Sequence, residues 1–348
     1  TLPILTNVLL QTTPQELTLT ATDLDLGIQC RLPLTGSIEE GAVTLPARKL
    51  ATIIRELPDE LVLLEAKKNH IATLQCGSSN FRIPGLPAED FPAFPTSEET
   101  GQMVVPQHVL RALVPLTSYA MSMEETRFIL NGALLTIQKS TLTMVATDGR
   151  RLAVASTPLT ATTKRPLDTI LPAKTVRELG RLLQTDEPCE VTITTLKDNQ
   201  LSFRFGSVSI VTRLLEGQFP QYDKVIPAPS KSTLRCERQG LINAIRRASL
   251  MTSATSQAVL FELGRERLVV SKESPELGSA REELPVTYTG EPMTVAFNPE
   301  FWLDVLKILQ DDEVAIEFSG ADRPAVIRLS RSPAQADFTY IVLPMKVT

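Results

Sequence analysis

The sequence predicts an α+β fold built from three copies of one unit, and three observations lead to this prediction. The chain has 348 residues, enough for two or three domains. Several segments recur further along the chain in the same order. Within each copy, short segments with alternating or β-branched residues outnumber segments with the apolar period of a helix. Such a mixture favours helices that cover one face of an antiparallel sheet.

The repeat is clearest between the first two copies. Three pairs of segments match: LTLTATDLDLGI (17–28) with LTMVATDGRRLAV (142–154), VTLPARKLATIIREL (43–57) with TILPAKTVRELGRLL (169–183), and EDFPAF (89–94) with GQFPQY (217–222). Equivalent residues lie 125 to 128 positions apart, as from Asp23 to Asp148 and from Phe91 to Phe219. In a weaker third copy, MTVAFNPEFWLDVLKIL stands where the second helix should recur. The period is too long for a solenoid repeat and indicates a triplicated domain.

The repeats predict domains at 1–97, 98–228 and 229–348. The second and third copies open with helix-bearing segments, VVPQHVLRALVPLTSYA and CERQGLINAIRRASLM, before their first long strands RFILNGALLTI and QAVLFEL. The first copy starts directly with the strand LPILTNVLLQ. We therefore expect a helix-bearing segment of roughly twenty residues to be missing from the front of the sequence.

The other predicted strands are short and are separated by turn residues. They cover 17–23, 73–83, 189–196, 201–205, 208–215, 313–318 and 325–330. The predicted helices carry apolar stripes at helical spacing, which bury one side of a helix. The stripes are Leu50, Ile53, Ile54 and Leu57; Val176, Leu179, Leu182 and Leu183; Leu241, Ile245 and Ala248; and Phe301, Val305, Leu306 and Leu309. Pro46 and Pro172 suit the first helical turn.

The composition excludes several classes of protein. Hydrophobic residues make up 43% and charged residues 22% of the chain, as in ordinary globular proteins, which excludes a disordered or collagen-like chain. No apolar run approaches the roughly 18–20 residues of a membrane span, and the first residues lack the basic region of a signal peptide. The four cysteines, which lie far apart without a CxxC pair, read as reduced residues of a cytoplasmic protein. They are Cys30, Cys76, Cys189 and Cys236.

Basic residues recur on the polar faces of the predicted helices, although the net charge is −5. Lys174, Arg177 and Arg181 follow i, i+3, i+7 spacing opposite the leucines. The other members are Arg48, Lys49, Arg55, Arg111, Arg238, Arg246 and Arg247. A solvated helix face is one explanation, but recurrence in separate copies favours sequence-independent contact with phosphates. The absence of aromatic residues among these arginines speaks against stacking on single strands.

The sequence offers little catalytic chemistry. The two histidines, His70 and His108, have no cysteine or histidine at metal-ligand spacing, and no phosphate-binding loop or nucleophile motif occurs. Asp23 and Asp148 are possible acids, but an aspartate after a strand favours a tight turn, and its presence in two copies favours an architectural role. We expect no catalytic residue, metal or cofactor; a hydrolase that uses either aspartate is an open alternative.

Four segments resemble the bacterial DNA sliding clamps, the beta subunits of replicative DNA polymerase III: YAMSMEETRFILNGALL, VATDGRRLAV, LLEGQFPQYDKVIP and YIVLPMKV. The similarity covers essentially the whole chain. It implies three clamp-type domains with antiparallel sheets outside and helices lining a central hole, in a head-to-tail dimeric ring around double-stranded DNA. It also implies a non-catalytic processivity factor in DNA replication, opened by an ATP-driven clamp loader. A non-ring, β-rich scaffold that binds peptides is the alternative.

The resemblance implies specific site residues. The family's pocket for short apolar peptides of polymerase III, the clamp loader, other polymerases and repair proteins matches Leu130, Thr147, Gly149, Arg150, Arg151, Leu152, Pro220, Lys224, Val225, Ile341, Val342, Leu343, Pro344 and Met345. The DNA-binding residues are Arg48, Arg55, Phe128, Ile129, Lys174, Arg177, Arg181, Arg238 and Arg246. The dimer interface matches Lys49, Phe81, Ile83, Leu250, Met251, Glu276 and Glu282. Arg150, Lys224 and Leu343 depart from the residues common in the family, which implies a shifted peptide preference.

Overall fold

The computed structural model describes residues 2–34, 38–67, 69–124, 126–159, 166–183, 189–329 and 336–346. Its backbone contacts form two compact units: unit 1 holds residues 1–107 and 187–214, and unit 2 holds 108–186 and 215–348. Every paired strand runs antiparallel to its neighbours within the described residues. In those residues, no helix has the length and apolar character that crossing a membrane requires.

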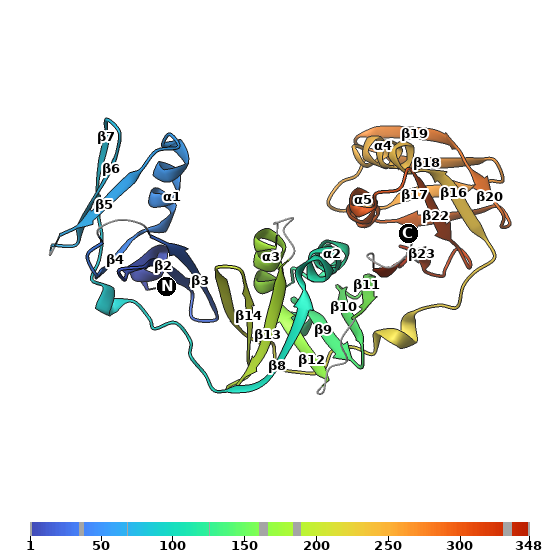
Figure 1. The fold of residues 1–348 in the computed structure, drawn as a ribbon. Coiled ribbons are helices and arrows are strands. Elements are labelled where there is room, and N and C mark those ends of the chain that lie inside the picture. The colour runs from blue at the N-terminus through green and yellow to red at the C-terminus, as the bar shows by residue number, and fades with distance from the viewer. Residues whose placement is uncertain are drawn as a thin grey trace. The chain divides into compact units, whose positions relative to one another are not determined.

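Unit 1 contains an eight-stranded and a three-stranded sheet (Figure 1). The larger sheet has the order β4-β1-β2-β3-β15-β14-β13-β8 and the smaller one β5-β6-β7. The bounds are β1 Asn7–Thr12, β2 Glu16–Thr22, β3 Leu26–Pro33, β4 Gly41–Pro46, β5 Val62–Ala66, β6 Ile71–Cys76, β7 Ser79–Pro84, β8 Glu99–Pro106, β13 Glu190–Leu196, β14 Gln200–Phe205 and β15 Val208–Arg213. The pair β3–β15, with Ile28 opposite Ile210, joins strands from the first and second sequence copies into one sheet.

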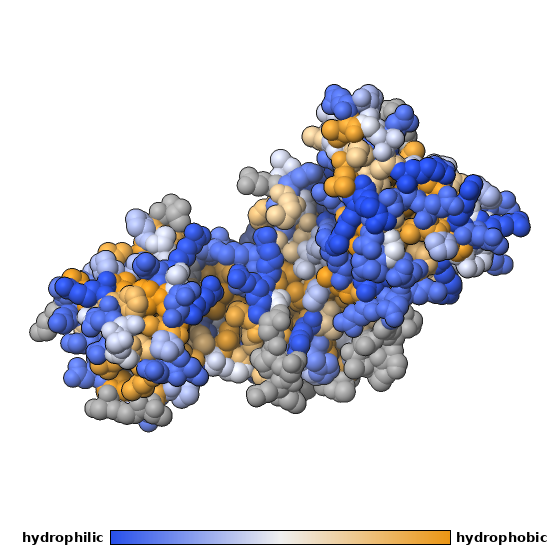
Figure 2. All heavy atoms as spheres, turned by 90° about the horizontal axis from the view of Figure 1, so that it is seen from above, coloured by the Kyte–Doolittle hydropathy of each residue, from blue (hydrophilic) through white to orange (hydrophobic). Residues whose placement is uncertain are grey.

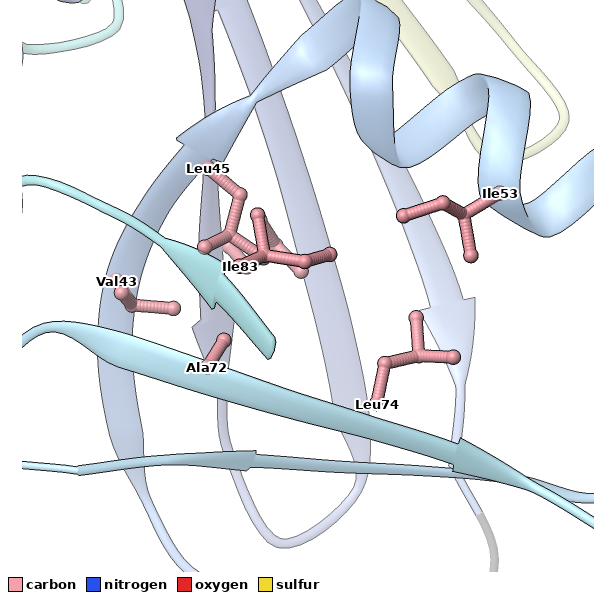
Figure 3. Packing of buried hydrophobic residues seen from close by; sticks show 7 residues of the cluster. Val43, Leu45, Ile53, Ala72, Leu74 and Ile83 are labelled. Atoms are coloured by element: carbon pink, nitrogen blue, oxygen red, sulfur yellow. The ribbon is translucent and has the colours of Figure 1, made fainter. Parts of the chain in front are cut away.

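Helix α1 (Ala47–Glu56) closes the apolar core of the first copy. Ile53 packs with buried aliphatic residues of β4, β6 and β7, which Figure 3 shows converging from the strands and the helix. Leu50 and Leu57 are partly buried against the same cluster. Ile54, predicted to lie in the apolar stripe, is instead 45% exposed, because a helix turns by about 100° per residue and carries it past the edge of the buried face.

Unit 2 contains a nine-stranded and a four-stranded sheet. The larger sheet has the order β12-β9-β10-β11-β24-β23-β22-β16-β20 and the smaller one β19-β18-β17-β21. The bounds are β9 Gly132–Gln138, β10 Thr141–Thr147, β11 Arg151–Pro158, β12 Leu167–Pro172, β16 Thr233–Glu237, β17 Val259–Leu263, β18 Arg267–Ser274, β19 Gly278–Pro285, β20 Thr287–Tyr288, β21 Met293–Phe297, β22 Glu313–Glu317, β23 Ala325–Leu329 and β24 Asp337–Val342. Its helices are α2 Gln107–Thr117, α3 Ala173–Leu182, α4 Arg238–Ser249 and α5 Pro299–Ile308.

The helices of unit 2 bury most of the stripes that the sequence predicts, with Leu182 and Phe301 half-buried. Leu241, Ile245 and Ala248 of α4 are fully buried. Helix α5 begins after Asn298, whose side chain accepts a hydrogen bond from the Glu300 amide at 2.9 Å and so caps the helix. On the space-filling view of one face, hydrophilic and hydrophobic residues are interspersed, as on most protein surfaces (Figure 2). The buried stripes therefore hold the helices, and their charged faces are left to solvent.

Three local predictions differ from the structure. The run 73–83 is a hairpin, β6 and β7, whose turn places Gly77 at φ +53°, a conformation that glycine adopts without strain. The predicted strands at 2–11 and 127–137 each begin with a 3₁₀ turn, at Pro3–Thr6 and Phe128–Leu130. Apolar character alone did not distinguish these turns from strands, because short apolar runs suit either structure.

Candidate peptide-binding surface and basic helix faces

The aspartate after β10 builds a turn. The Asp148 Oδ1 atom accepts hydrogen bonds from the amides of Arg150 at 2.9 Å and Arg151 at 3.0 Å. The Thr147 hydroxyl accepts from the Gly149 amide at 3.0 Å, and Gly149 has φ +84°. The Thr147 hydroxyl is therefore occupied by a hydrogen bond within the turn.

The first copy repeats this turn. Asp23 Oδ1 accepts from the amides of Asp25 at 3.2 Å and Leu26 at 2.8 Å. The Thr22 hydroxyl accepts from the Leu24 amide at 3.0 Å, and Leu24 has φ +81°. Both aspartates thus act as turn-forming acceptors, which favours the architectural role over the catalytic one.

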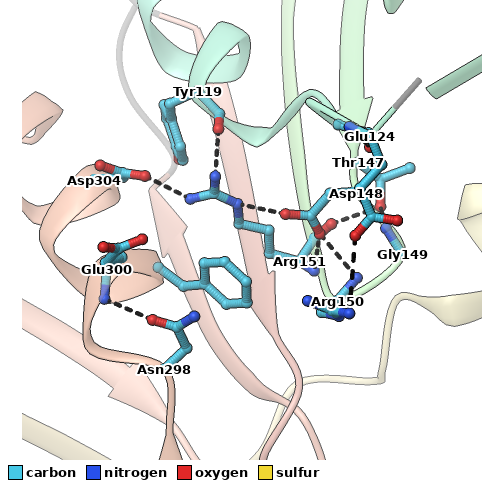
Figure 4. A network of polar contacts seen from close by, with 12 residues as sticks. Tyr119, Glu124, Thr147, Asp148, Gly149, Arg150, Arg151, Asn298, Glu300 and Asp304 are labelled. Atoms are coloured by element: carbon cyan, nitrogen blue, oxygen red, sulfur yellow. Dashed lines mark hydrogen bonds and ion pairs between the residues drawn. The ribbon is translucent and has the colours of Figure 1, made fainter. Parts of the chain in front are cut away.

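Arg151 is the centre of a polar network that Figure 4 shows between β11 and α5. Its Nε lies 3.0 Å from Asp148 Oδ2 and its Nη1 lies 2.7 Å from Asp304 Oδ2. Its Nη2 donates to the Tyr119 carbonyl at 2.6 Å, and the guanidinium lies 4.5 Å from the ring centre of Phe301. The side chain is only 10% exposed. Arg151 therefore positions the turn and α5 rather than offering free donors to a ligand.

The network includes residues that the sequence analysis missed. Arg151 contacts Tyr119, Phe301 and Asp304. Asp304 lies 153 positions further along the chain. Burial raises the pKa of the Tyr119 hydroxyl well above its usual value, so this side chain is neutral in the folded protein. No local sequence signal marks the contacts with Phe301 and Asp304, because these two residues come from a different repeat than Arg151.

An apolar surface lies along the β11–β24 pair. Leu152 faces Ile341 across the pair, and both belong to a buried cluster with Phe219. Val225, next in the chain to Ile226 of this cluster, is 59% exposed, and Leu343, which follows β24, is 43% exposed. A buried apolar floor with exposed apolar side chains beside it suits the binding of an apolar peptide.

The segment after β24 is fixed by main-chain hydrogen bonds. The Leu343 amide donates to the Arg150 carbonyl at 2.9 Å, and the Met345 amide donates to the Ala296 carbonyl at 2.8 Å. The first bond holds Leu343 beside the Asp148 turn, and the second holds Met345 beside β21. The exposed members of the predicted pocket are Gly149, Arg150, Pro220, Lys224, Val225, Leu343 and Met345, the half-buried ones Leu130, Arg151 and Pro344, and the buried ones Thr147, Leu152, Ile341 and Val342.

The predicted DNA contacts on the helices are mostly exposed within their own units. On α1 of unit 1, Arg48 and Arg55 are exposed. In unit 2, the predicted contacts that are exposed are Lys174, Arg177 and Arg181 on α3 and Arg246 on α4. Exposed guanidinium and ammonium groups on helices suit weak contact with phosphates.

Three other predicted DNA residues have different surroundings. The Arg238 guanidinium donates to the carbonyls of Asp311 at 2.6 Å and Leu306 at 3.0 Å, at the end of α5. Ile129 packs against the apolar cluster beneath the peptide surface. Phe128 is 58% exposed. Arg238 and Ile129 therefore support the fold, and we leave them out of the proposed contacts with DNA.

The predicted interface residues are divided between the units. In unit 1, Lys49 is exposed, whereas Ile83 is 3% exposed within the core and Phe81 packs partly against it. We leave Ile83 out of the proposed interface, because its surface is already covered. In unit 2, Leu250 is 72% exposed, Met251 is half-buried and Glu276 is exposed. Glu282 lies 2.6 Å from Arg247 of the same chain, which lowers the pKa of its carboxyl group through a hydrogen bond.

Comparison with known proteins identifies the family. Models of the DNA polymerase III beta subunit match the chain in three parts: the N-terminal domain at residues 1–95, the central domain at 104–221 and the C-terminal domain at 223–346. The beta sliding clamp of Chlamydia muridarum is 32% identical over 346 residues, which cover 99% of this chain and 92% of that protein. The chain belongs to the DNA polymerase III beta subunit family. In this family, three clamp-type domains form a non-catalytic DNA sliding clamp that serves as a processivity factor.

Solved structures of sliding clamps agree with this membership of the beta subunit family. A sliding clamp of Bartonella birtlesii bound to griselimycin is 32% identical, has a TM-score of 0.90, and matches 100% of this chain and 93% of that one. The beta subunit of Thermotoga maritima is 27% identical, with a TM-score of 0.89 and the same coverage. The predicted α+β class with three clamp-type domains is confirmed, whereas the exact domain boundaries and the individual site residues stay predictions.

Proposed function

We propose that two copies of this chain close head to tail into a ring around double-stranded DNA and act as its cytoplasmic sliding clamp. The observation that supports this most directly is the recurrence of exposed cations on helix faces of all three sequence copies: Arg48 and Arg55, Arg177 and Arg181, and Arg246. The protein as a whole is acidic, with a net charge of −5. Exposed cations that recur on these helix faces would attract phosphates there.

The proposed contacts hold DNA without reading its sequence. Arginine and lysine contacts with phosphates carry no base information. Each exposed contact is weak in salt, so the duplex can move past the helices. Persistence on DNA would then come from enclosure rather than from affinity, and the chain itself would hydrolyse nothing.

The apolar surface would tether partners to the ring. We propose that Val225, Leu343, Met345 and Pro220 bind short apolar peptides of the polymerase III core, the clamp loader, other polymerases and repair proteins. Three of these side chains are large, apolar and at least 36% exposed, and the main-chain bonds after β24 fix two of them in place. Such a preformed surface lowers the entropy cost of binding a peptide.

Retention on DNA tests the enclosure. After loading by a bacterial clamp loader onto nicked circular duplex, the protein should stay bound through gel filtration at high salt. Linearising the same DNA should release it, because it can then slide off the ends. Equal loss from both forms of DNA would contradict the proposal and favour a scaffold that does not encircle DNA.

Peptide binding tests the surface separately. Leu343→Asp should weaken binding of an apolar clamp-binding peptide at least tenfold, because it places a charge beside the apolar floor. Leu32→Asp is a matched control, since Leu32 is 40% exposed and lies in unit 1. Both variants should still elute from gel filtration as a dimer of the native size, which does not require the clamp loader. Unchanged peptide affinity in Leu343→Asp would count against the assigned surface.

A further inference from the structure

Unit 1 contains a second strand junction that matches the one beneath the peptide surface. In unit 1, the Asp25 carbonyl accepts from the Arg213 amide at 2.9 Å; in unit 2, the Arg150 carbonyl accepts from the Leu343 amide, also at 2.9 Å. The first bond joins the start of β3 to the end of β15, and the second joins the start of β11 to the end of β24. The two junctions are thus equivalent in the repeat.

The chemistry of the first junction differs from that of the second. Where β11 has Leu152, the equivalent position on β3 is Gly27, and Phe94 and Pro95 of the segment before β8 lie over it. A side chain added at Gly27 would come within 3.2 Å of Phe94 and 3.3 Å of Pro95. Beside these residues is a cavity of about 870 Å³ on the face of the sheet.

Two arginines stand on the floor of this cavity. Ser209 of β15 lies between Gln29 of β3 and Arg204 of β14 in the register, so their side chains share one face of the sheet. Arg31, two residues from Gln29, is on the same face and also lines the cavity. The guanidinium groups therefore flank a row of serine side chains.

Both guanidinium groups are available to a ligand. Arg31 donates to Gln29 Oε1 at 3.3 Å, which is a neutral partner. Among the described residues, neither Arg31 nor Arg204 forms an ion pair. A guanidinium group fits the geometry of a carboxylate through two parallel N–H donors. Because neither arginine has a carboxylate partner, these donors can bind a carboxylate of a ligand.

The margins of the cavity define the kind of anion that fits. Glu16, opposite Pro33, stands at one margin and Glu99, opposite Leu196, at another. These carboxylates disfavour acidic groups at the ends of an extended ligand, while the arginines favour them in the middle. Phe94 and Pro95 supply an apolar wall on which aliphatic parts of such a ligand can pack.

We propose that this cavity is a second docking groove, which binds an extended peptide with acidic residues at its centre and neutral or basic residues at its ends. The groove is separate from the apolar peptide surface of unit 2, and its assignment does not depend on the function of that surface. A partner protein with such a segment would gain a second contact with the chain and hence a higher overall affinity.

A direct binding measurement tests this proposal. The probe is a hexapeptide with two central glutamates and a lysine at each end, labelled with a neutral dye, and anisotropy is read at low salt. The native chain should bind it saturably. Arg31→Gln with Arg204→Gln should weaken binding at least tenfold, as should glutamine in place of both glutamates of the probe. Leu343→Asp should leave binding unchanged.

The matched control is Arg265→Gln with Arg323→Gln, which changes the net charge equally at two exposed positions of unit 2. This control should stay within twofold of the native affinity. Urea unfolding of the Arg31/Arg204 variant should match the native protein, since both side chains are exposed. Failure of the native chain to saturate, or equal weakening in the control, would overturn the groove. Displacement of the probe by an equal concentration of inorganic phosphate would also overturn it, because a simple anion site would then suffice.

Discussion

Replacing Arg151 with alanine should destabilise unit 2, because the side chain links β11 to α5 through buried polar contacts. The substitution removes two ion pairs, with N–O distances of 3.0 and 2.7 Å, and a hydrogen bond of 2.6 Å. It leaves Asp148, whose side chain is 16% exposed, and Asp304, which is 35% exposed, without their cation. Breaking a buried pair costs about 3–5 kcal/mol.

The partial exposure of Asp304 lowers this cost, so we expect a loss of about 3 kcal/mol in the free energy of unfolding. The assay is urea unfolding followed by fluorescence of Trp302, the single tryptophan, which is fully buried in α5. With an m-value of about 2 kcal/mol/M, the midpoint should fall by about 1.5 M. Because Trp302 lies in α5, its fluorescence follows the unfolding of the part of unit 2 that contains the network.

Two further variants show whether the network causes this loss. Asp304→Asn should cost about 1 kcal/mol, since it removes one charge from a pair that is partly exposed. Arg181→Ala is the control: its side chain is 75% exposed and its contact with Glu178 is 3.3 Å long, so the midpoint should barely move. If Arg151→Ala shifts the midpoint no more than Arg181→Ala does, the structural role assigned to Arg151 is refuted.

Three other predictions concern turns, salt and pH. Leu24→Gly should raise the free energy of unfolding by roughly 0.5–1 kcal/mol in urea titration, because Leu24 holds φ +81° while 58% exposed; a decrease would refute the strain. Alanine at Arg48 and Arg177 should reduce the slope of log affinity for duplex DNA against log salt by about two per chain, and an unchanged slope would remove these residues from the DNA contacts. Burial raises the pKa of the Cys236 thiol from 9.0 to about 12. Above a pH of about 9, the thiol therefore stays protonated in the folded chain but loses its proton in the unfolded chain. Stability should therefore fall as the pH rises above about 9, and Cys236→Ala should reduce this fall; an identical pH dependence in both proteins would contradict it.

Much of the local structure could be predicted from periodicity. The stripe Leu241, Ile245 and Ala248 is fully buried on α4, as predicted, because apolar burial follows the helical period directly. The aspartate turns were also predictable, since Asp23 and Asp148 accept hydrogen bonds from amides only two and three residues on. These features depend on neighbours close in sequence.

Other residues have surroundings that the sequence did not indicate, because their partners are distant. Ile83 looked like a surface contact, but the smaller sheet of unit 1 turns it into the core. Arg238 looked like one of several similar basic residues on helices, but the end of α5 captures its guanidinium. Composition and spacing could not separate Arg238 from Arg246, which is exposed on the same helix.

The amino-acid sequence alone determined the triplication, the α+β class and the positions of the amphipathic helices, because repeats and apolar periods are properties of neighbouring residues. Tertiary structure decided which of the charged side chains are free and which are bound. Arg151 illustrates this division: its place after β10 was evident from the repeat, but its contact with Asp304 exists only because β11 and α5, from different repeats, pack together. Electrostatic contacts of this kind depend on distance in space, which a one-dimensional pattern does not contain.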